Sequence, residues 1–293
     1  MTTVYMNGEY LPKREAAVSP DDRGFLLADG VYEVTPAYDG EFFGLDGHLE
    51  RLERGLEELR IGLDVEPLAE VHRRLLEENG LAEVPTAKVY LQVTRGAARR
   101  QHAFPEAEPE PTVYAFATEW TAPDAVEWEE GCSAVTVPDR RWSRVDIKSI
   151  ALLPNVLAQQ AARDAGAEES IFVHEGVAIE GAHANFWAVL DGTVVTHPAT
   201  NRILPGITRA TVLELARDRG HPVRERPVQV EELPGADEVF LTGTTTEVLP
   251  ITELDGEPVS DGSPGPVSRD LFVAYREKVG GPVPAFPAPA GGA

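Results

Sequence analysis

The segment Val145-Asp146-Ile147-Lys148-Ser149 places a lysine among apolar residues in the middle of the chain. Lysine is rare in this protein, which has four of them: Lys13, Lys88, Lys148 and Lys278. Burial penalises the cation, so apolar surroundings favour the neutral amine. A neutral amine is what a Schiff base with an aldehyde cofactor requires. On its own such a segment is more typical of a solvated lysine, so the rest of the chain decides between the two interpretations.

Length and composition describe an ordinary globular protein. With 293 residues, 42% of them hydrophobic, the chain can form a sizeable core and two compact domains. It contains no apolar run near the roughly 20 residues that span a bilayer, and its N-terminus lacks the features of a signal peptide. We therefore expect a cytoplasmic protein. Cys132 is the single cysteine and the seven histidines show no paired spacing, so we expect neither a disulfide nor a metal site.

The chain is strongly acidic, with a formal net charge of −23 spread along its whole length. Such a surface makes nucleic acid and anionic membranes poor partners. Together with the scarcity of lysine, the charge favours adaptation to high salt, where counterions screen self-repulsion. The alternative is an acidic protein from a high-GC genome whose basic residues drifted to arginine, and composition alone leaves both open.

Residues 1–120 predict a small α+β domain, because strand-like alternation and helical stripes mix without strict order. The Asn-Gly and Asp-Gly turns predict hairpins, and the leucine stripe from 49 to 59 predicts a helix capped by Asp46. The expected strands are Val4–Met6, Glu9–Leu11, Val31–Tyr38, Glu41–Leu45, Thr86–Thr94 and Thr112–Thr118, with a second helix at Pro67–Glu78.

Residues 121–125 predict a linker, and 126–279 a larger domain. The strands expected there are Ser133–Val137, Ser170–His174, Val177–Ile179, Asn185–Leu190, Thr193–Thr196, Asp237–Leu241 and Val248–Leu254. The expected helices are Asn155–Ala165, Thr208–Asp218 and Ser268–Lys278. The Gly- and Pro-rich residues 280–293 cannot form a packed core, and we expect a disordered tail.

Three places could bind the phosphate of an aldehyde cofactor. Leu204-Pro205-Gly206-Ile207-Thr208-Arg209 opens a helix, whose free N–H groups bind anions. Thr242–Thr246 offers a second cluster of hydroxyl and N–H donors, and Arg51 on the leucine-striped helix is a third candidate. Taken singly, an ordinary N-cap, a polar turn and a solvated arginine are the more common explanations.

Glu180 follows the apolar strand end Ala178-Ile179 and precedes Gly181. A carboxylate facing a pyridine nitrogen keeps that nitrogen protonated, which makes the ring a better electron sink. The alternative is a solvated glutamate at the end of a hairpin.

Five motifs occur in a characteristic order along the chain. They are Asp146-Ile-Lys-Ser, Asn155-Val-Leu, Glu180-Gly…Asn185-Phe, Leu204-Pro-Gly-Ile-Thr-Arg and Leu241-Thr…Thr-Thr-Glu-Val. This series resembles the pyridoxal-phosphate aminotransferases of the branched-chain and D-amino acid aminotransferase family, from about Val4 to Tyr275. The resemblance implies a small N-terminal α+β domain, a larger C-terminal domain with a β-barrel-like core, and a homodimer that binds pyridoxal 5'-phosphate.

The resemblance also assigns roles by position. Lys148 matches the Schiff-base lysine, which also moves the substrate Cα proton, and Glu180 matches the partner of the pyridine nitrogen. Arg51, Ile207, Thr208 and Thr244 match residues of the phosphate site. Leu204 matches the side chain that packs on the ring.

Two further segments look like the D-amino acid aminotransferase pattern: Gly30-Val-Tyr-Glu-Val34 and Arg95-Gly…Arg100-Gln-His-Ala-Phe-Pro105. In that pattern a tyrosine, an arginine and a histidine surround the substrate α-carboxylate, the last two from the partner subunit. Here these are Tyr32, Arg100 and His102. A guanidinium suits a carboxylate because it can bind both oxygens. One position departs from the pattern, since Pro36 stands where these enzymes often carry lysine.

We therefore expect transamination between a D-amino acid, such as D-alanine or D-glutamate, and a 2-oxo acid. Two alternatives share the fold, a branched-chain L-amino acid aminotransferase and an aminodeoxychorismate-type lyase. A non-enzymatic binding protein that keeps the fold is a third.

Overall fold

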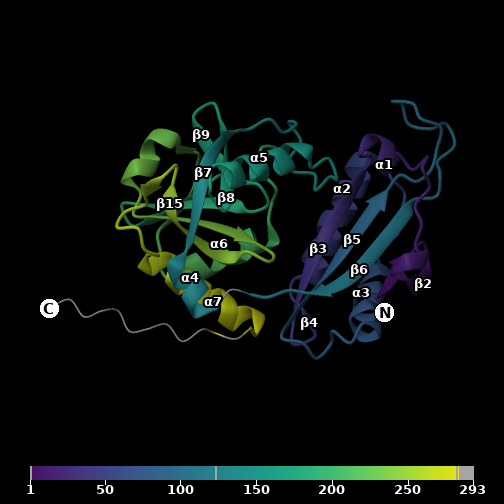
Figure 1. Cartoon of the computed structure of the whole chain (residues 1–293), viewed down its shortest axis with the longest axis horizontal. Coiled ribbons are helices and arrows are strands. Elements are labelled where there is room, and N and C mark those ends of the chain that lie inside the picture. The colour runs from purple at the N-terminus through teal and green to yellow at the C-terminus, as the bar shows by residue number, and fades with distance from the viewer. Residues whose placement is uncertain (1, 123, 282, 284–293) are drawn as a thin grey trace. The chain divides into compact units, whose positions relative to one another are not determined.

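The computed structural model describes residues 2–122, 124–281 and 283, and divides the chain into two compact units (Figure 1). Unit 1 comprises Met1–Trp120, Arg141–Pro154 and Thr200–Ile207, and unit 2 comprises Thr121–Arg140, Asn155–Ala199 and Thr208–Ala293. The expected domain limits differ from these units, because residues 141–154 and 200–207 contact the first 120 residues. The tail expected from residue 280 lies largely outside the described residues.

Unit 1 is built on a six-stranded sheet in the order β2-β1-β6-β5-β3-β4. Figure 1 shows β3, β5 and β6 running side by side, as their antiparallel registers require. The strands are β1 (Thr3–Met6), β2 (Glu9–Pro12), β3 (Gly30–Tyr38), β4 (Glu41–Phe42), β5 (Thr86–Thr94) and β6 (Thr112–Glu119). The expected hairpins and the long strand Thr86–Thr94 are thus confirmed.

Helices α2 (Leu45–Leu59) and α3 (Leu68–Glu78) cover one face of this sheet. Their leucines pack on the alternate strand residues that point to the same side, such as Val31, Val89 and Leu91. The other face carries Tyr32, Tyr90 and Phe116, which stay partly exposed. A short α1 (Arg23–Leu27) and a 3-10 turn (Lys13–Glu15) were not expected from the sequence.

The predicted capping role of Asp46 is wrong. Helix α2 begins at Leu45, and its N-cap is Gly44 in the left-handed conformation with φ 67°. Asp46 therefore lies in the first turn, where its negative charge still interacts favourably with the helix dipole. A β-carbon on Gly44 would lie 3.0 Å from Ile207 Cγ2, so the close approach of Ile207 also favours glycine at this cap.

Unit 2 contains a closed ring of strands. Its ten-stranded sheet runs β12-β11-β10-β14-β15-β7-β8-β9-β13, with β16 paired to β15. Strand β9 also pairs with β10 through Asn185 and Glu180, which closes β10, β14, β15, β7, β8 and β9 into a six-stranded barrel. The ring strands are β7 (Cys132–Pro138), β8 (Glu169–His174), β9 (Val177–Gly181), β10 (Asn185–Leu190), β14 (Glu238–Gly243) and β15 (Glu247–Leu254).

Four helices accompany this barrel: α4 (Ala125–Glu130), α5 (Leu153–Asp164), α6 (Ile207–Asp218) and α7 (Pro266–Val279). Helix α4 begins inside the predicted linker, with Asp124 and Glu127 forming a capping box. The remaining short elements are β11 (Thr193–Thr196), β12 (Val223–Glu225), β13 (Val228–Gln229), β16 (Glu257–Pro258) and a 3-10 turn (Val230–Gly235). Across the described residues no helix is both long and apolar enough to span a membrane.

Candidate active site

Lys148 is held by main-chain hydrogen bonds at the edge of β3. The Tyr32 N–H donates to the Lys148 carbonyl at 3.0 Å, and the Ile150 N–H donates to the Gly30 carbonyl at 3.1 Å. A β-carbon on Gly30 would lie 2.5 Å from the Val93 carbonyl oxygen, so only glycine fits there. These bonds place the Lys148 ammonium 4.3 Å from the centre of the Tyr32 ring.

Helix α2 holds the same segment from a second direction. Arg54 donates to the Asp146 carbonyl at 3.1 Å. Arg144 donates to both Asp146 carboxylate oxygens at 3.0 Å and pairs with Glu58 at 3.0 Å. Because these side chains lie near the surface, their ion pairs add orientation more than stability.

Three charged or titratable side chains meet under β3, in the core between the sheet and α2. The two oxygens of Glu33 accept from Arg51 Nε and Nη2, both at 2.7 Å, and from His48 Nδ1 at 2.8 Å. All three residues are buried. Burial alone would raise the pKa of Glu33, but the Arg51 guanidinium and the His48 hydrogen bond hold it well below its usual range. Glu33 is therefore an anion that fixes the plane of Arg51.

His48 stays neutral in this cluster. Burial lowers its pKa, and the Arg51 and Lys148 cations add to that effect against the opposing influence of Glu33. Lys148 and Arg51, both predicted for the same site, therefore lie close enough to influence one histidine. Glu33 and His48 were not predicted from the sequence, although strand alternation in Tyr32-Glu33-Val34 already turned a carboxylate toward the core.

Arg51 also reaches the segment that leads into α6. Its Nη1 donates to the Pro205 carbonyl at 3.1 Å. Ile207 lies against the start of α2, where a β-carbon on Gly47 would be 3.3 Å from its Cδ1 atom. Arg51 and Ile207 thus both lie at the junction of α2 with residues 204–207 of unit 1, where Leu204 is partly buried.

In unit 2, Glu180 lies where the barrel closes. Glu180 is the register partner of Asn185, whose Nδ2 donates to Glu180 Oε1 at 2.9 Å. Both side chains are buried. Asn155 on α5 donates to the Ala182 carbonyl at 2.7 Å and so fixes the turn between the two strands. The carboxylate is therefore oriented and kept away from bulk solvent.

The two other residues predicted to bind the cofactor phosphate, Thr208 and Thr244, also lie in unit 2. Thr208 is buried in the first turn of α6, a twelve-residue helix whose first N–H groups lack helical partners. Thr244 is half-buried in the turn between β14 and β15. The neighbouring Thr242 hydroxyl accepts from the Trp187 indole N–H at 2.8 Å, which ties the start of this turn to the barrel.

Arg100 and His102 are placed differently from the other predicted residues. Both are exposed on the loop between β5 and β6, and neither forms a hydrogen bond or ion pair with another described residue. The main chain of that loop is nevertheless fixed, because Arg23 Nη1 donates to the Gln101 carbonyl at 2.7 Å.

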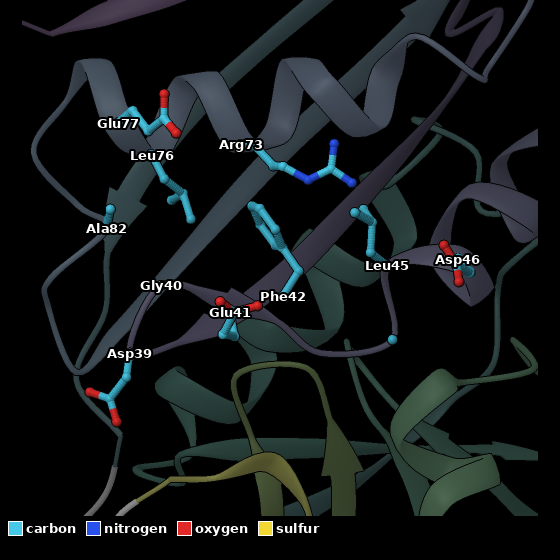
Figure 2. A pocket seen from close by; sticks show the side chains of 11 residues that line it. Asp39, Gly40, Glu41, Phe42, Leu45, Asp46, Arg73, Leu76, Glu77 and Ala82 are labelled. Atoms are coloured by element: carbon cyan, nitrogen blue, oxygen red, sulfur yellow. The ribbon is translucent and has the colours of Figure 1, made fainter.

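A separate hollow of about 650 Å³ opens on unit 1 beside α3 and the start of α2 (Figure 2). Phe42, Leu45 and Leu76 form its apolar part, with Arg73 above them and carboxylates around the rim. None of the predicted site residues lines it. The described residues contain no group of three His, Cys, Asp or Glu that could hold a metal ion.

The sequence model of the class IV amino-transferase family matches residues 30–254. The chain belongs to the class IV aminotransferases. It is 44% identical over 281 residues to a D-alanine aminotransferase of Staphylococcus epidermidis, covering 95% of this chain and 98% of that protein. It is 39% identical over 277 residues to a D-alanine aminotransferase of Bacillus licheniformis, covering 94% and 96%.

Solved structures of the same class share the fold. The branched-chain amino acid aminotransferase of Escherichia coli superposes with a TM-score of 0.86 at 28% identity, covering 94% of this chain and 93% of that one. The enzyme of the same name from T.th., solved with pyridoxamine 5'-phosphate, gives 0.87 at 28% identity with the same coverage. Class IV aminotransferases use pyridoxal 5'-phosphate to exchange an amino group between an amino acid and a 2-oxo acid, so the chain is an enzyme of this kind.

Proposed function

We propose that this aminotransferase acts on D-amino acids, with D-alanine or D-glutamate as donor and a 2-oxo acid as acceptor. The observation that carries the proposal is the fixed position of Lys148 over Tyr32, in a chain 39% to 44% identical to proteins named D-alanine aminotransferases. Both matches cover the two proteins nearly end to end. In addition, this chain carries Tyr32, Arg100 and His102 in the D-amino acid aminotransferase pattern.

The residues present fit the cofactor's three functional parts. An amine for the aldehyde is available at Lys148, and a buried, oriented carboxylate for the ring nitrogen at Glu180. For the phosphate, the chain supplies the fixed guanidinium of Arg51, the first turn of α6 with Ile207 and Thr208, and Thr244 in its turn. Leu204 supplies the apolar contact to the ring. When bound, the cofactor withdraws electrons from the substrate Cα.

Lys148 carries the proton transfer in this proposal. Its Nζ atom takes the proton from Cα of the amino donor. In the second half-reaction Nζ delivers a proton to Cα of the amino acid that forms from the 2-oxo acid. The main-chain bonds to Tyr32 and Gly30 hold the lysine backbone still, so only the side chain moves between the two positions. Glu33 keeps Arg51 from rotating during this cycle.

The substrate α-carboxylate would bind Tyr32 of one chain together with Arg100 and His102 of a second chain. Support comes from the exposure of both loop residues, which leaves their donors available to another chain. Leu153, Val156 and Leu157 on α5 are also exposed, at 68%, 59% and 59%, and such apolar groups favour burial by a second copy. We therefore propose a homodimer with shared sites. The cytoplasmic location stays a prediction from the sequence.

Mixed dimers test the shared site. Lys148→Ala and Arg100→Gln chains, each inactive alone, are unfolded together, refolded as a mixture and assayed with D-alanine. If Arg100 acts in trans, half of the dimers regain one intact site and activity returns to about a quarter of wild type. A mixture that stays inactive while the heterodimer forms would show that Arg100 serves its own chain.

Substrate stereochemistry tests the donor. Initial rates with D-alanine and D-glutamate are compared with those for L-leucine and L-isoleucine, using 2-oxoglutarate as acceptor. The proposal predicts a preference for the D-amino acids of at least about a hundredfold, since a mirror-image donor cannot present both its Cα proton and its carboxylate correctly. A preference for L-leucine would favour the branched-chain activity that the solved relatives are named for. Pyruvate release from an aromatic amino precursor over many turnovers, with no 2-oxo acid acceptor present, would favour a lyase.

A further inference from the structure

Two buried arginines share one carboxylate at the base of the loop that carries Arg100 and His102. Arg23 Nε donates to Asp29 Oδ2 at 2.7 Å, and Arg95 Nε donates to the same oxygen at 2.8 Å. The side chains of Arg23 and Arg95 are 2% and 3% exposed, and that of Asp29 is 10% exposed. Burial would raise the pKa of Asp29, but its hydrogen bonds to Arg95 and Arg23 hold it below its usual value.

The two arginine cations outnumber the single Asp29 anion, and their remaining N–H groups donate to main-chain carbonyls. Arg95 donates to the Leu59 carbonyl at 2.6 Å and to the Arg60 carbonyl at 3.0 Å, both at the end of α2. Arg23 instead uses its Nη1 to bind the Gln101 carbonyl at 2.7 Å. One arginine is therefore anchored to a helix, and the other reaches into the loop.

The loop is held by contacts on both sides of His102. Gln101 stands between Arg100 and His102, so the Arg23 bond acts on the Gln101–His102 peptide, one residue after Arg100. Two residues beyond His102, the Phe104 ring lies 3.8 Å from the Arg95 guanidinium. Phe104 is 48% exposed, so its position there depends on the arginine more than on a surrounding core.

The cluster also connects this loop to β3. Asp29 directly precedes β3, its carbonyl accepts from the Arg95 N–H at 3.1 Å, and the Arg23 N–H donates to the Gly96 carbonyl at 3.0 Å. Any shift of the loop would leave a buried guanidinium N–H without its acceptor, which is unfavourable.

We propose that Arg23, held by Asp29, is a positioning residue that sets the geometry of the Arg100 and His102 carboxylate site. The proposal rests on the function proposed above. Within the described residues Arg100 and His102 form no hydrogen bond or ion pair, and residues 101–104 are held by the contacts with Arg23 and Arg95. The other hydrogen bonds of the loop lie at Ala98 and Glu108.

The test compares D-alanine with D-alaninamide, which has the same shape but no carboxylate. For each variant, the second-order rate constant of the amino-donor half-reaction is measured for both compounds and expressed as a ratio. Arg23→Lys keeps the charge beside Asp29 but cannot bind Asp29 and the Gln101 carbonyl together. We expect the ratio to fall about tenfold, through a higher KM for D-alanine, with little change in the rate for D-alaninamide.

Two other variants make the result decisive. Arg99→Lys changes an exposed arginine of the same loop and should keep the wild-type ratio. Phe104→Ala removes the other contact without touching a buried charge, and should lower the ratio about threefold even if Arg23→Lys does not fold.

Arg100→Gln separates the two proposals. If Arg100→Gln leaves the ratio unchanged, the proposed carboxylate site itself is wrong. The positioning role is overturned by a different result. In that result Arg100→Gln lowers the ratio strongly, but Arg23→Lys and Phe104→Ala leave both the ratio and the affinity for D-alanine unchanged. An equal loss of rate for both compounds in Arg23→Lys would indicate general damage and would also count against the proposal.

Discussion

At the scale of single residues, the site depends on charges held in place by buried partners. Glu33 is surrounded by apolar strand neighbours and would be costly as an isolated anion. Its bonds to both Arg51 nitrogens and to His48 offset that cost. The result is an arginine whose guanidinium plane is fixed, as its proposed role in binding the cofactor phosphate requires.

Removing this anchor should affect both stability and cofactor binding. Glu33→Gln leaves Arg51 with a weaker acceptor, and we expect it to destabilise the protein by roughly 3 kcal/mol at neutral pH and to weaken cofactor affinity about tenfold. Urea unfolding and titration with pyridoxal phosphate measure the two effects. Glu53→Gln, at an exposed position on α2 close to Arg51 in sequence, is the control.

The pH dependence gives this prediction a direction. The pKa of Glu33 is lower in the folded state than in the unfolded chain, so its ion pair stabilises the fold above the ordinary pKa of 4.5. Below that value the unfolded state takes up the proton first. The stability difference between wild type and Glu33→Gln should therefore be constant from pH 8 to about pH 5.5 and shrink at more acidic pH. A difference that grows on acidification would contradict the assignment.

At the scale of elements, the packing of α3 on the sheet includes a buried histidine. His72 Nδ1 donates to the Leu68 carbonyl at 2.7 Å, and its Nε2 lies 3.3 Å from the Thr35 hydroxyl of β3. Burial lowers its pKa from 6.5 to about 4. In the folded protein His72 is therefore neutral at pH values where the unfolded chain is already protonated.

This difference predicts a loss of stability on mild acidification. Between pH 7 and pH 5 the unfolded state gains a proton at residue 72 that the folded state does not, which costs about 2 kcal/mol. His72→Gln removes this contribution, so its urea midpoint should decline less over the same range than that of wild type. His174→Gln, at a partly buried position in β8, is the control. An identical decline in wild type and His72→Gln would contradict the shifted pKa.

Local sequence rules predicted most of the strands and helices, but few of the tertiary contacts between them. Alternation and Asn-Gly or Asp-Gly turns located β1 to β3, and the Thr86–Thr94 strand matches β5 residue for residue. The five-residue α1 and the two-residue β13 and β16 were missed because they are shorter than the patterns that identify them, and the strand expected at Glu41–Leu45 is only the two-residue β4. Asp46 was mistaken for a cap because Gly44, with its tight contact to Ile207, is chosen by tertiary packing.

The site divides in the same way. Lys148, Glu180 and Thr208 were predicted because their types match a chemical need at recognisable motifs. Glu33 and Asp29 were missed because their roles depend on partners far away in sequence, namely Arg51 and Arg95. The bond that closes the barrel, between Glu180 and Asn185, likewise becomes visible only when β9 and β10 are placed side by side.

At the scale of the whole molecule, the net charge of −23 makes self-repulsion a property of the entire surface. If the surface is adapted to salt, raising KCl from about 0.1 M to about 1 M shortens the Debye length from about 10 Å to about 3 Å and should raise Tm by at least about 5 °C. Thermal unfolding of the cofactor-loaded enzyme measures this. A Tm that stays constant or falls would favour the alternative of compositional drift.

The central claim joins Lys148 to a D-amino acid, and the visible spectrum of the purified protein tests it most directly. We predict a yellow absorption from cofactor held by Lys148, which disappears on addition of D-alanine, persists with L-leucine and is absent from Lys148→Ala. Lys278→Ala, a surface lysine on α7, should behave as wild type. Loss of the band with L-leucine but not with D-alanine would overturn the stereochemical claim, and an unchanged D-alanine response in Lys148→Ala would overturn the role of the lysine.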